Sequence, residues 1–184
     1  MTATTRAASG GTFWTGRRSR PWRRQGAAPS DGSGATVSDD GTMIHVAAGG
    51  SSDAQLVWIS AEGEVGRAIG QAQEGIFAPR LSPDGTGVLV TGQENGEWDI
   101  WIHDVARGSK TRLTFSDGVE GSANWSPDGK TVFFQHPVFG GSPGIYTVPS
   151  DGRWDPRELI QGGQFSLSAD GEQLVFVRNH EERG

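Results

Sequence analysis

The chain has 184 residues, of which 34% are apolar, with 29 glycines, nine prolines and no cysteine. This length is sufficient for one domain with a hydrophobic core, and the lack of cysteine excludes disulfides, thiol nucleophiles and thiolate metal sites. The net charge of −6 is unevenly distributed: residues 1–30 hold six arginines and no acidic residue, so residues 31–184 carry −12.

The Arg-rich head, residues 1–32, is predicted to be disordered, because it combines high charge with no apolar periodicity. A tether to an acidic surface or nucleic acid and a targeting segment are the lesser alternatives, and no nucleic-acid partner is expected. The chain shows no secretory signal and no run of about 20 apolar residues, so no membrane span is expected. The compartment stays open, with the cytoplasm as the default.

A tetrapeptide repeats through the rest of the chain. The four copies begin after Val37, Leu81, Trp125 and Leu167, with spacings of 44, 44 and 42 residues, and read Ser38-Asp39-Asp40-Gly41, Ser82-Pro83-Asp84-Gly85, Ser126-Pro127-Asp128-Gly129 and Ser168-Ala169-Asp170-Gly171. Proline presets the second turn position, aspartate bonds its own backbone, and glycine takes the left-handed conformation. Each copy therefore predicts a tight turn between two strands.

The flanks of the turn repeat as well. Apolar residues stand six and eight positions after each serine, as in the pair Val88 and Val90, and the residue between them is mostly apolar. This pattern is typical of a strand that is covered on both faces. A third strand with a central aromatic follows and ends at Gly63, Gly108 or Gly152. The fourth strand is least distinct, and Arg112–Phe115 is its clearest example.

Four short antiparallel strands per 42 to 44 residues match the length of a β-propeller blade. The predicted fold is therefore all-β, a propeller of four-stranded antiparallel blades with about 3.5 blades present in an incomplete ring. The blades are assigned to residues 33–75, 76–118 and 119–162, and half of a fourth blade to residues 163–184. The aromatics Trp58, Trp101, Trp125 and Tyr146 are expected to fill the spaces between blades, with ligand contact as the alternative.

The segments Pro79–Gly85, Asp99–Asp104 and Thr111–Phe115 resemble the TolB-like, WD-like propeller repeats of bacteria, and the likeness covers residues 34–178. The repeat is most similar to the C-terminal propeller of bacterial serine/threonine protein kinases, which is thought to be a sensor or interaction domain. The resemblance implies a scaffold whose members are often extracytoplasmic or periplasmic, and it does not identify a ligand.

Related propellers usually close with six or more blades, so a fragment of a larger propeller is the favoured explanation of the unfinished fourth blade. Self-association through open blade edges and a complete four-bladed ring are the alternatives.

Catalytic motifs give no support for an enzyme. The sequence has no glycine-rich phosphate loop, paired lysine or His-Arg-Asp loop, which excludes kinase activity for this chain. Gly140–Gly144 matches Gly-x-Ser-x-Gly around Ser142, but it is expected to join two strands, whereas a nucleophile elbow needs a strand before it and a helix after it. We therefore expect no catalytic residue and no enzyme activity.

Metal and cofactor sites are not expected either. The four histidines, His45, His103, His136 and His180, lack close ligand spacing, and Asp39, Asp40 and Asp53 match no calcium loop. His103 and Asp104 are interpreted as a pair that supports a strand-end turn, with ligand contact as the alternative. Asn124 fits a glycosylation acceptor formally but precedes the inward-facing Trp125, so it is discounted.

The sequence therefore predicts a non-catalytic binding or scaffold module for a protein or peptide, with a possible sensory role. The alternative is an accessory propeller of an enzyme, a kinase sensor domain or a prolyl-oligopeptidase-like peptidase, whose catalytic domain is absent from this chain. Ligand contact is expected in the loops that vary between repeats, Gly49–Gln55, Gln93–Glu97 and Pro137–Gly144.

Overall fold

A computed structural model describes residues 35–37, 43–48, 53–137, 143–153 and 155–178. The described residues contain fourteen strands and no helix. The strands are β1 (Ala35–Val37), β2 (Met43–Ala48), β3 (Asp53–Ile59), β4 (Val65–Glu74), β5 (Phe77–Leu81), β6 (Gly87–Glu94), β7 (Glu97–Asp104), β8 (Lys110–Arg112), β9 (Gly121–Trp125), β10 (Thr131–His136), β11 (Gly144–Pro149), β12 (Arg157–Gln161), β13 (Gly163–Leu167) and β14 (Leu174–Val177).

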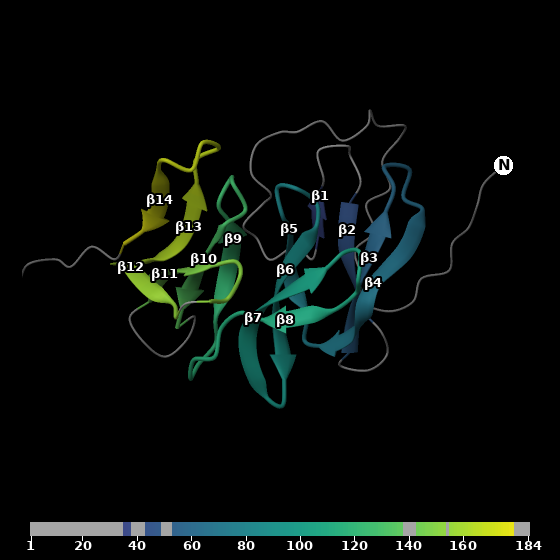
Figure 1. Ribbon diagram of the computed structural model, residues 1–184, viewed down its shortest axis with the longest axis horizontal. Coiled ribbons are helices and arrows are strands. Elements are labelled where there is room, and N and C mark those ends of the chain that lie inside the picture. The colour runs from purple at the N-terminus through teal and green to yellow at the C-terminus, as the bar shows by residue number, and fades with distance from the viewer. Residues whose placement is uncertain (1–34, 38–42, 49–52, 138–142, 154, 179–184) are drawn as a thin grey trace, which may run out of the picture.

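The strands form three four-stranded antiparallel sheets and one two-stranded sheet. Each sheet keeps its strands in chain order, β1–β4, β5–β8, β9–β12 and β13–β14. We refer to them as blade 1, blade 2, blade 3 and the half-blade. Figure 1 shows them following one another from blade 1 to the half-blade, without closing into a ring. The first strands of blades 1, 2 and 3 are neighbours, because β5 packs against both β1 and β9, whereas the first strand of the half-blade packs against β11.

The central strand of blade 2 is covered on both faces, as its apolar run predicts. Val88, Leu89 and Val90 are all fully buried. Val88 and Val90 enter the core between blades 1 and 2, whereas Leu89 enters the core between blades 2 and 3. Successive side chains of a strand point to opposite faces, so β6 joins the two cores. In β7, Trp101 likewise enters the core between blades 1 and 2, and Ile100 enters the core between blades 2 and 3.

The aromatics that the sequence assigns to packing lie in or against these cores. Trp101 is buried, and Trp58 packs partly buried against the same cluster. Trp125 and Tyr146 pack partly buried against the core between blades 2 and 3.

Tight turns connect the strands at both ends of the sheets. The β6–β7 hairpin turns at Asn95 and Gly96, which have φ angles of 54° and 86°. Two consecutive left-handed residues are typical of a two-residue hairpin whose twist matches that of its strands. The predicted turn glycines Gly63, Gly108 and Gly152 also have positive φ angles.

The first strands of blade 2, blade 3 and the half-blade share a β-bulge that the sequence pattern does not predict. Ala78, Ser122 and Gln164 each stand four residues before the serine of the next turn, and their φ angles are 51°, 53° and 43°. The strand register shifts at each of these places. Since the three side chains differ, the bulge repeats in the backbone without repeating in the sequence.

The fourth strand of blade 2 lies earlier in the chain than the predicted Arg112–Phe115, because β8 covers Lys110–Arg112. β8 ends at Arg112, although the amide of Leu113 still donates to the carbonyl oxygen of Ile100 at 2.8 Å. The next ladder bond comes from a side chain, because the amide of Ile100 donates to Thr114 Oγ1 at 3.0 Å. Thr114 thereby replaces the backbone partner of Ile100, and the chain leaves the sheet.

Candidate functional site

The three described copies of the Ser-x-Asp-Gly turn are built alike. In the first, the Ser82 hydroxyl donates to Asp84 Oδ1 at 2.6 Å and accepts from the amide of Gly87 at 2.9 Å. The amide of Thr86 also donates to Asp84 Oδ1, at 3.1 Å. The turns at Ser126 and Ser168 repeat these three bonds. Gly85, with φ of 74°, completes the turn.

These turns fix their aspartates in the ionised form. Hydrogen bonds from Ser82 and Thr86 lower the pKa of Asp84, and bonds from Ser126 and Lys130 lower that of Asp128. The turn bonds use Oδ1 of each carboxylate. Among the described residues, no hydrogen bond engages Oδ2 of Asp84 or Asp128, so each turn leaves one anionic oxygen for an external donor.

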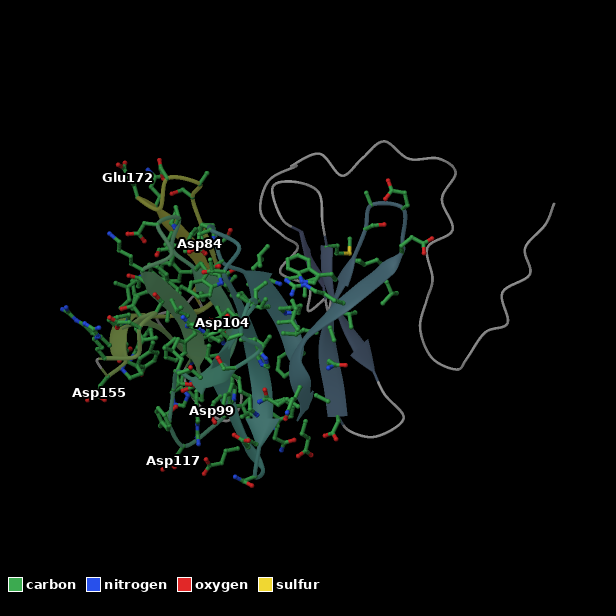
Figure 2. All side chains as sticks on the ribbon, turned by 45° about the vertical axis from the view of Figure 1, so that its right-hand side comes forward. Asp84, Asp99, Asp104, Asp117, Asp155 and Glu172 are labelled. Atoms are coloured by element: carbon green, nitrogen blue, oxygen red, sulfur yellow. The ribbon has the colours of Figure 1, made fainter. Side chains whose placement is uncertain are left out.

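A groove of about 370 Å³ lies between blades 2 and 3 at the end of the sheets that carries these turns. We call it the Asp-turn groove. Its lining is Ser82, Asp84, Thr86, Gly87, Ile102, Asp104, Trp125, Asp128, Gly129, Lys130 and Ser150. Figure 2 places Asp84 and Glu172 toward this end of the sheets and Asp99 and Asp117 toward the other.

Two lining residues depart from the repeat. Gly87 stands five positions after its serine, where Thr131 and Gln173 stand in the later repeats. Trp125 stands directly before its serine, where Leu81 and Leu167 stand in two others. A Cβ at Gly87 would lie 3.3 Å from Ile102 and 3.7 Å from the Trp125 ring. A side chain at position 87 would therefore crowd Ile102 and touch the half-buried indole, and both residues that depart from the repeat line the groove.

The third carboxylate of the groove, Asp104, also holds a turn. Its Oδ1 accepts from the amides of Ala106 and Arg107 at 2.9 and 2.7 Å, and its Oδ2 lies 3.4 Å from the Arg107 guanidinium. Lys130 supplies one positive charge to the lining against Asp84, Asp104 and Asp128. The groove is therefore an anionic, aromatic-walled surface on rigid turns.

The predicted pairing of His103 with Asp104 is only half observed. Asp104 supports the strand-end turn, but His103 is buried and its Nε2 lies 3.1 Å from Oε1 of Gln73, in blade 1. Burial, with a smaller contribution from the charge of Lys110, lowers the pKa of His103 to about 4. His103 therefore links blades 1 and 2 as a neutral side chain.

A second polar cluster is buried toward the opposite end of the sheets. Asp99 Oδ2 lies 2.7 Å from Arg112 Nη2, a close ion pair, although neither oxygen of Asp99 accepts a well-aligned hydrogen bond. Glu120 is fully buried and accepts hydrogen bonds from Thr114 and Ser116. Burial raises the pKa of both Asp99 and Glu120. The adjacent Arg112 guanidinium opposes the rise at Asp99, and hydrogen bonds from Ser116 and Thr114 oppose it at Glu120.

Ser116, His136 and Glu120 do not form a catalytic triad. The Ser116 hydroxyl lies 3.5 Å from His136 Nδ1, and Glu120 Oε1 lies 4.0 Å from the same nitrogen. A triad needs the serine and the acid on different ring nitrogens, so that the acid orients the ring while the other nitrogen takes the proton. The three residues therefore link the segment that connects blades 2 and 3 to β10. Their geometry does not suit nucleophilic attack.

The other candidates from the sequence lie apart or outside the described residues. Ser142, Asp39, Asp40 and His180 belong to the undescribed residues, as do parts of the loops Gly49–Gln55 and Pro137–Gly144. No group of three or more histidine, aspartate or glutamate residues with metal-binding geometry occurs in the described ranges. Those ranges also contain no helix long and apolar enough to cross a membrane.

The groove is the part of the site that sequence reasoning missed. Of the predicted ligand loops, Gln93–Glu97 lies at the opposite end of β6 and β7 from the groove, and Trp125 was assigned chiefly to packing, with ligand contact as the alternative. The sequence feature that could have indicated the groove is that Gly87 and Trp125 both differ from the residues at the same positions of the other repeats.

The sheet order, the repeated turns and the stacked cores define the chain as a β-propeller. The family described as "TolB beta propeller domain" matches residues 34–183. The chain therefore belongs to this family.

Known proteins share both sequence and fold with the chain. The Tol-Pal system protein TolB of Alcanivorax borkumensis is 32% identical over 77 residues, 41% of this chain and 18% of that protein. The crystal structure of TolB from Acinetobacter baumannii superposes with a TM-score of 0.66 at 20% identity, over 82% of this chain and 38% of the other. The chain thus spans well under half the length of these TolB proteins.

An enzyme structure shares the fold too. A solved structure of prolyl endopeptidases has a TM-score of 0.53 at 19% identity, over 72% of this chain and 22% of the other. Identity at this level shows the fold alone. The relatives named TolB are not kinases, so the closer resemblance to kinase-associated propellers stays a prediction.

Proposed function

We propose that this chain is a non-catalytic propeller module that docks a protein or peptide partner in the Asp-turn groove. The observation that carries the proposal is the groove itself, where Gly87 and Trp125 break the repeat between two turns that hold ionised aspartates. Rigid turns and a half-exposed indole suit binding, because little conformational freedom is lost when a partner is bound. The similarity to a TolB protein of a Tol-Pal system supports a protein partner.

The alternative, an accessory propeller of an enzyme, rests on fold similarity alone. The fold occurs in prolyl endopeptidase structures as well as in TolB, so it does not discriminate between the two functions. No described residue of this chain favours the enzyme alternative.

Site-specific photocrosslinking tests the proposal. A photoreactive p-benzoylphenylalanine replaces Lys130, an exposed residue of the groove, and in a matched chain it replaces Glu172, which stands at the same repeat position outside the groove. After irradiation in cell extract, discrete protein adducts are expected from position 130 and not from position 172. Equal adducts from both positions, or adducts from position 172 alone, would contradict the proposal.

A further inference from the structure

We propose that two copies of this chain associate through β14, which pairs antiparallel with the β14 of the second copy. The inference goes beyond the proposed function, because β14 belongs to the half-blade and does not line the Asp-turn groove. β14 bonds to β13 on one side, and no described strand pairs with its other side. An open strand edge presents backbone N–H and C=O groups that can pair with another chain.

The edge formed by β14 differs from the other outer edges because it carries no charge. The outermost strand of each of the three blades contains two charged residues, namely Arg67 and Glu74 in β4, Lys110 and Arg112 in β8, and Arg157 and Glu158 in β12. Charged side chains on an edge strand oppose pairing with another chain. β14 reads Leu-Val-Phe-Val, without charge, proline or glycine. The blades therefore protect their outer edges, whereas the edge of the half-blade is suited to pairing.

The free side of β14 offers the backbone groups of Leu174 and Phe176. The amide of Ser168 donates to the carbonyl oxygen of Gln173 at 2.9 Å, so these two residues form a hydrogen-bonded pair of the β13–β14 hairpin. Hydrogen-bonded and non-hydrogen-bonded pairs alternate along an antiparallel ladder. Leu174 is therefore in a non-hydrogen-bonded pair with β13, as is Phe176 two positions later. Both residues direct their N–H and C=O groups to the open edge.

The side chains of β14 are apolar but exposed. Val175 is 71% exposed and Val177 is 54% exposed. Leu89 stands at the same repeat position as Val175, seven residues after the serine of its turn, and it is fully buried. A paired strand brings the valines of the second copy against Val175 and Val177, and cross-strand contacts between β-branched side chains stabilise a sheet.

The sequence of β14 itself selects a second copy as its partner. In blades 2 and 3, the strand that pairs with the open side of the second strand is apolar around a central aromatic, as in Ile100-Trp101-Ile102 and Ile145-Tyr146-Thr147. Val175-Phe176-Val177 has the same pattern. β14 can therefore take the place of a third strand beside another β14. The sheet formed by two half-blades then has four strands, as each complete blade does.

The charge that follows β14 sets the orientation of the pair. Arg178 comes directly after the strand, and its guanidinium carbon lies 5.3 Å from the centre of the Phe176 ring. Parallel pairing would place the two Arg178 side chains next to each other, and like charges directly opposite destabilise a sheet. Antiparallel pairing places them at opposite ends of the paired strands. Such a pair is twofold symmetric and uses the same edge of both copies, so the association closes at two chains.

Sedimentation equilibrium of the purified full chain tests the proposal. The chain, of 19.5 kDa, should be a monomer at about 1 µM and a dimer at about 100 µM, because a contact between two short strands is small and its affinity modest. Amide hydrogen exchange at Leu174 and Phe176 should slow as the concentration rises, since these amides gain acceptors only in the dimer. At the dilution of a cell extract the chain is a monomer, so the crosslinking comparison of positions 130 and 172 is unaffected.

A charge on β14 should weaken the dimer. Val175→Lys should raise the dissociation constant by about tenfold or more, because it places lysines of both copies within reach of each other across the pair. Val65→Lys is the matched control, since Val65 is 70% exposed on the edge strand β4 of blade 1, and it should leave the dissociation constant within about twofold. Mixing Val175→Lys chains with Val175→Glu chains should restore the dimer as a mixed pair, which also shows that both variants are folded.

A chain that stays monomeric at about 100 µM, a dimer that Val175→Lys leaves intact, or equal weakening by Val65→Lys would overturn the proposal. Protection of Leu174 and Phe176 that does not depend on concentration would also overturn it, because the strand beside β14 would then belong to the same chain. Association that continues beyond two chains would contradict the twofold pair. These outcomes concern β14 alone, whereas the proposed function depends on the adducts formed at position 130.

Discussion

Acid should weaken the contact between blades 1 and 2 through His103. The buried ring is 1% exposed and its pKa is lowered to about 4, against about 6.5 in an unfolded chain. Between these pH values the unfolded chain binds the proton and the folded chain does not, so stability decreases as the pH falls. The contribution is fully present above pH 6.5 and fully lost below pH 4.

The size of the effect follows from the same two pKa values. A difference of about 2.5 pH units amounts to about 3 kcal/mol over the whole range, and to about 2 kcal/mol between pH 8 and pH 5. His103→Gln removes the titration and retains a donor for Gln73 Oε1. The decrease in the free energy of unfolding caused by His103→Gln should therefore be about 2 kcal/mol smaller at pH 5 than at pH 8.

Equilibrium urea unfolding, followed by tryptophan fluorescence at both pH values, measures this difference. Comparing the variant with the wild type cancels the effects of other titrating groups, including the buried Glu120, whose raised pKa acts in the opposite direction. Lys110→Gln is the secondary test, because removing the cation that lowers the pKa of His103 should reduce the acid sensitivity slightly. A cost of His103→Gln that stays constant within about 0.5 kcal/mol would refute this account.

Three further predictions concern stability and are measured by urea unfolding. Leu89→Ala should cost about 2–5 kcal/mol because it empties a fully buried site between blades 2 and 3, whereas Val175→Ala, at a position 71% exposed, should cost less than about 0.5 kcal/mol. Gly85→Ala should cost about 1–2 kcal/mol from backbone strain at φ of 74°, since no atom lies within 4 Å of the added Cβ, and Gly85→Asn should cost less. Glu120→Gln should gain stability relative to wild type as the pH rises from 5 to 8, because burial raises the pKa of Glu120 and the charged form is the costly one. An equal cost of Gly85→Ala and Gly85→Asn, or a pH-independent effect of Glu120→Gln, would count against the respective argument.

The sequence was sufficient to predict the propeller class and the position of each described Ser-x-Asp-Gly turn. Both depend on local chemistry that repeats, such as the Ser82 to Asp84 hydrogen bond and the alternation of Val88 and Val90. The bulges at Ala78, Ser122 and Gln164 were not predictable, because three different side chains adopt the same left-handed backbone under the constraint of neighbouring strands.

The candidate site was harder to predict than the fold. The groove depends on a glycine in β6 and a tryptophan in β9, which are far apart in sequence and meet only when blades 2 and 3 pack. His103 shows the same limit, since its neighbour in sequence is Asp104 but its hydrogen-bond partner Gln73 belongs to another blade. Contacts between blades are set by tertiary packing, which local patterns do not encode.

The most direct test of the docking site restores the regular repeat in the groove while the crosslinker stays in place. Gly87→Thr and Trp125→Leu install the residues that the same repeat positions carry at Thr131 and Leu81, and the crosslinker again replaces Lys130. The account predicts that this variant remains folded and loses the protein adducts formed at position 130. Undiminished adducts in a folded chain would contradict the assignment of the Asp-turn groove as the docking site.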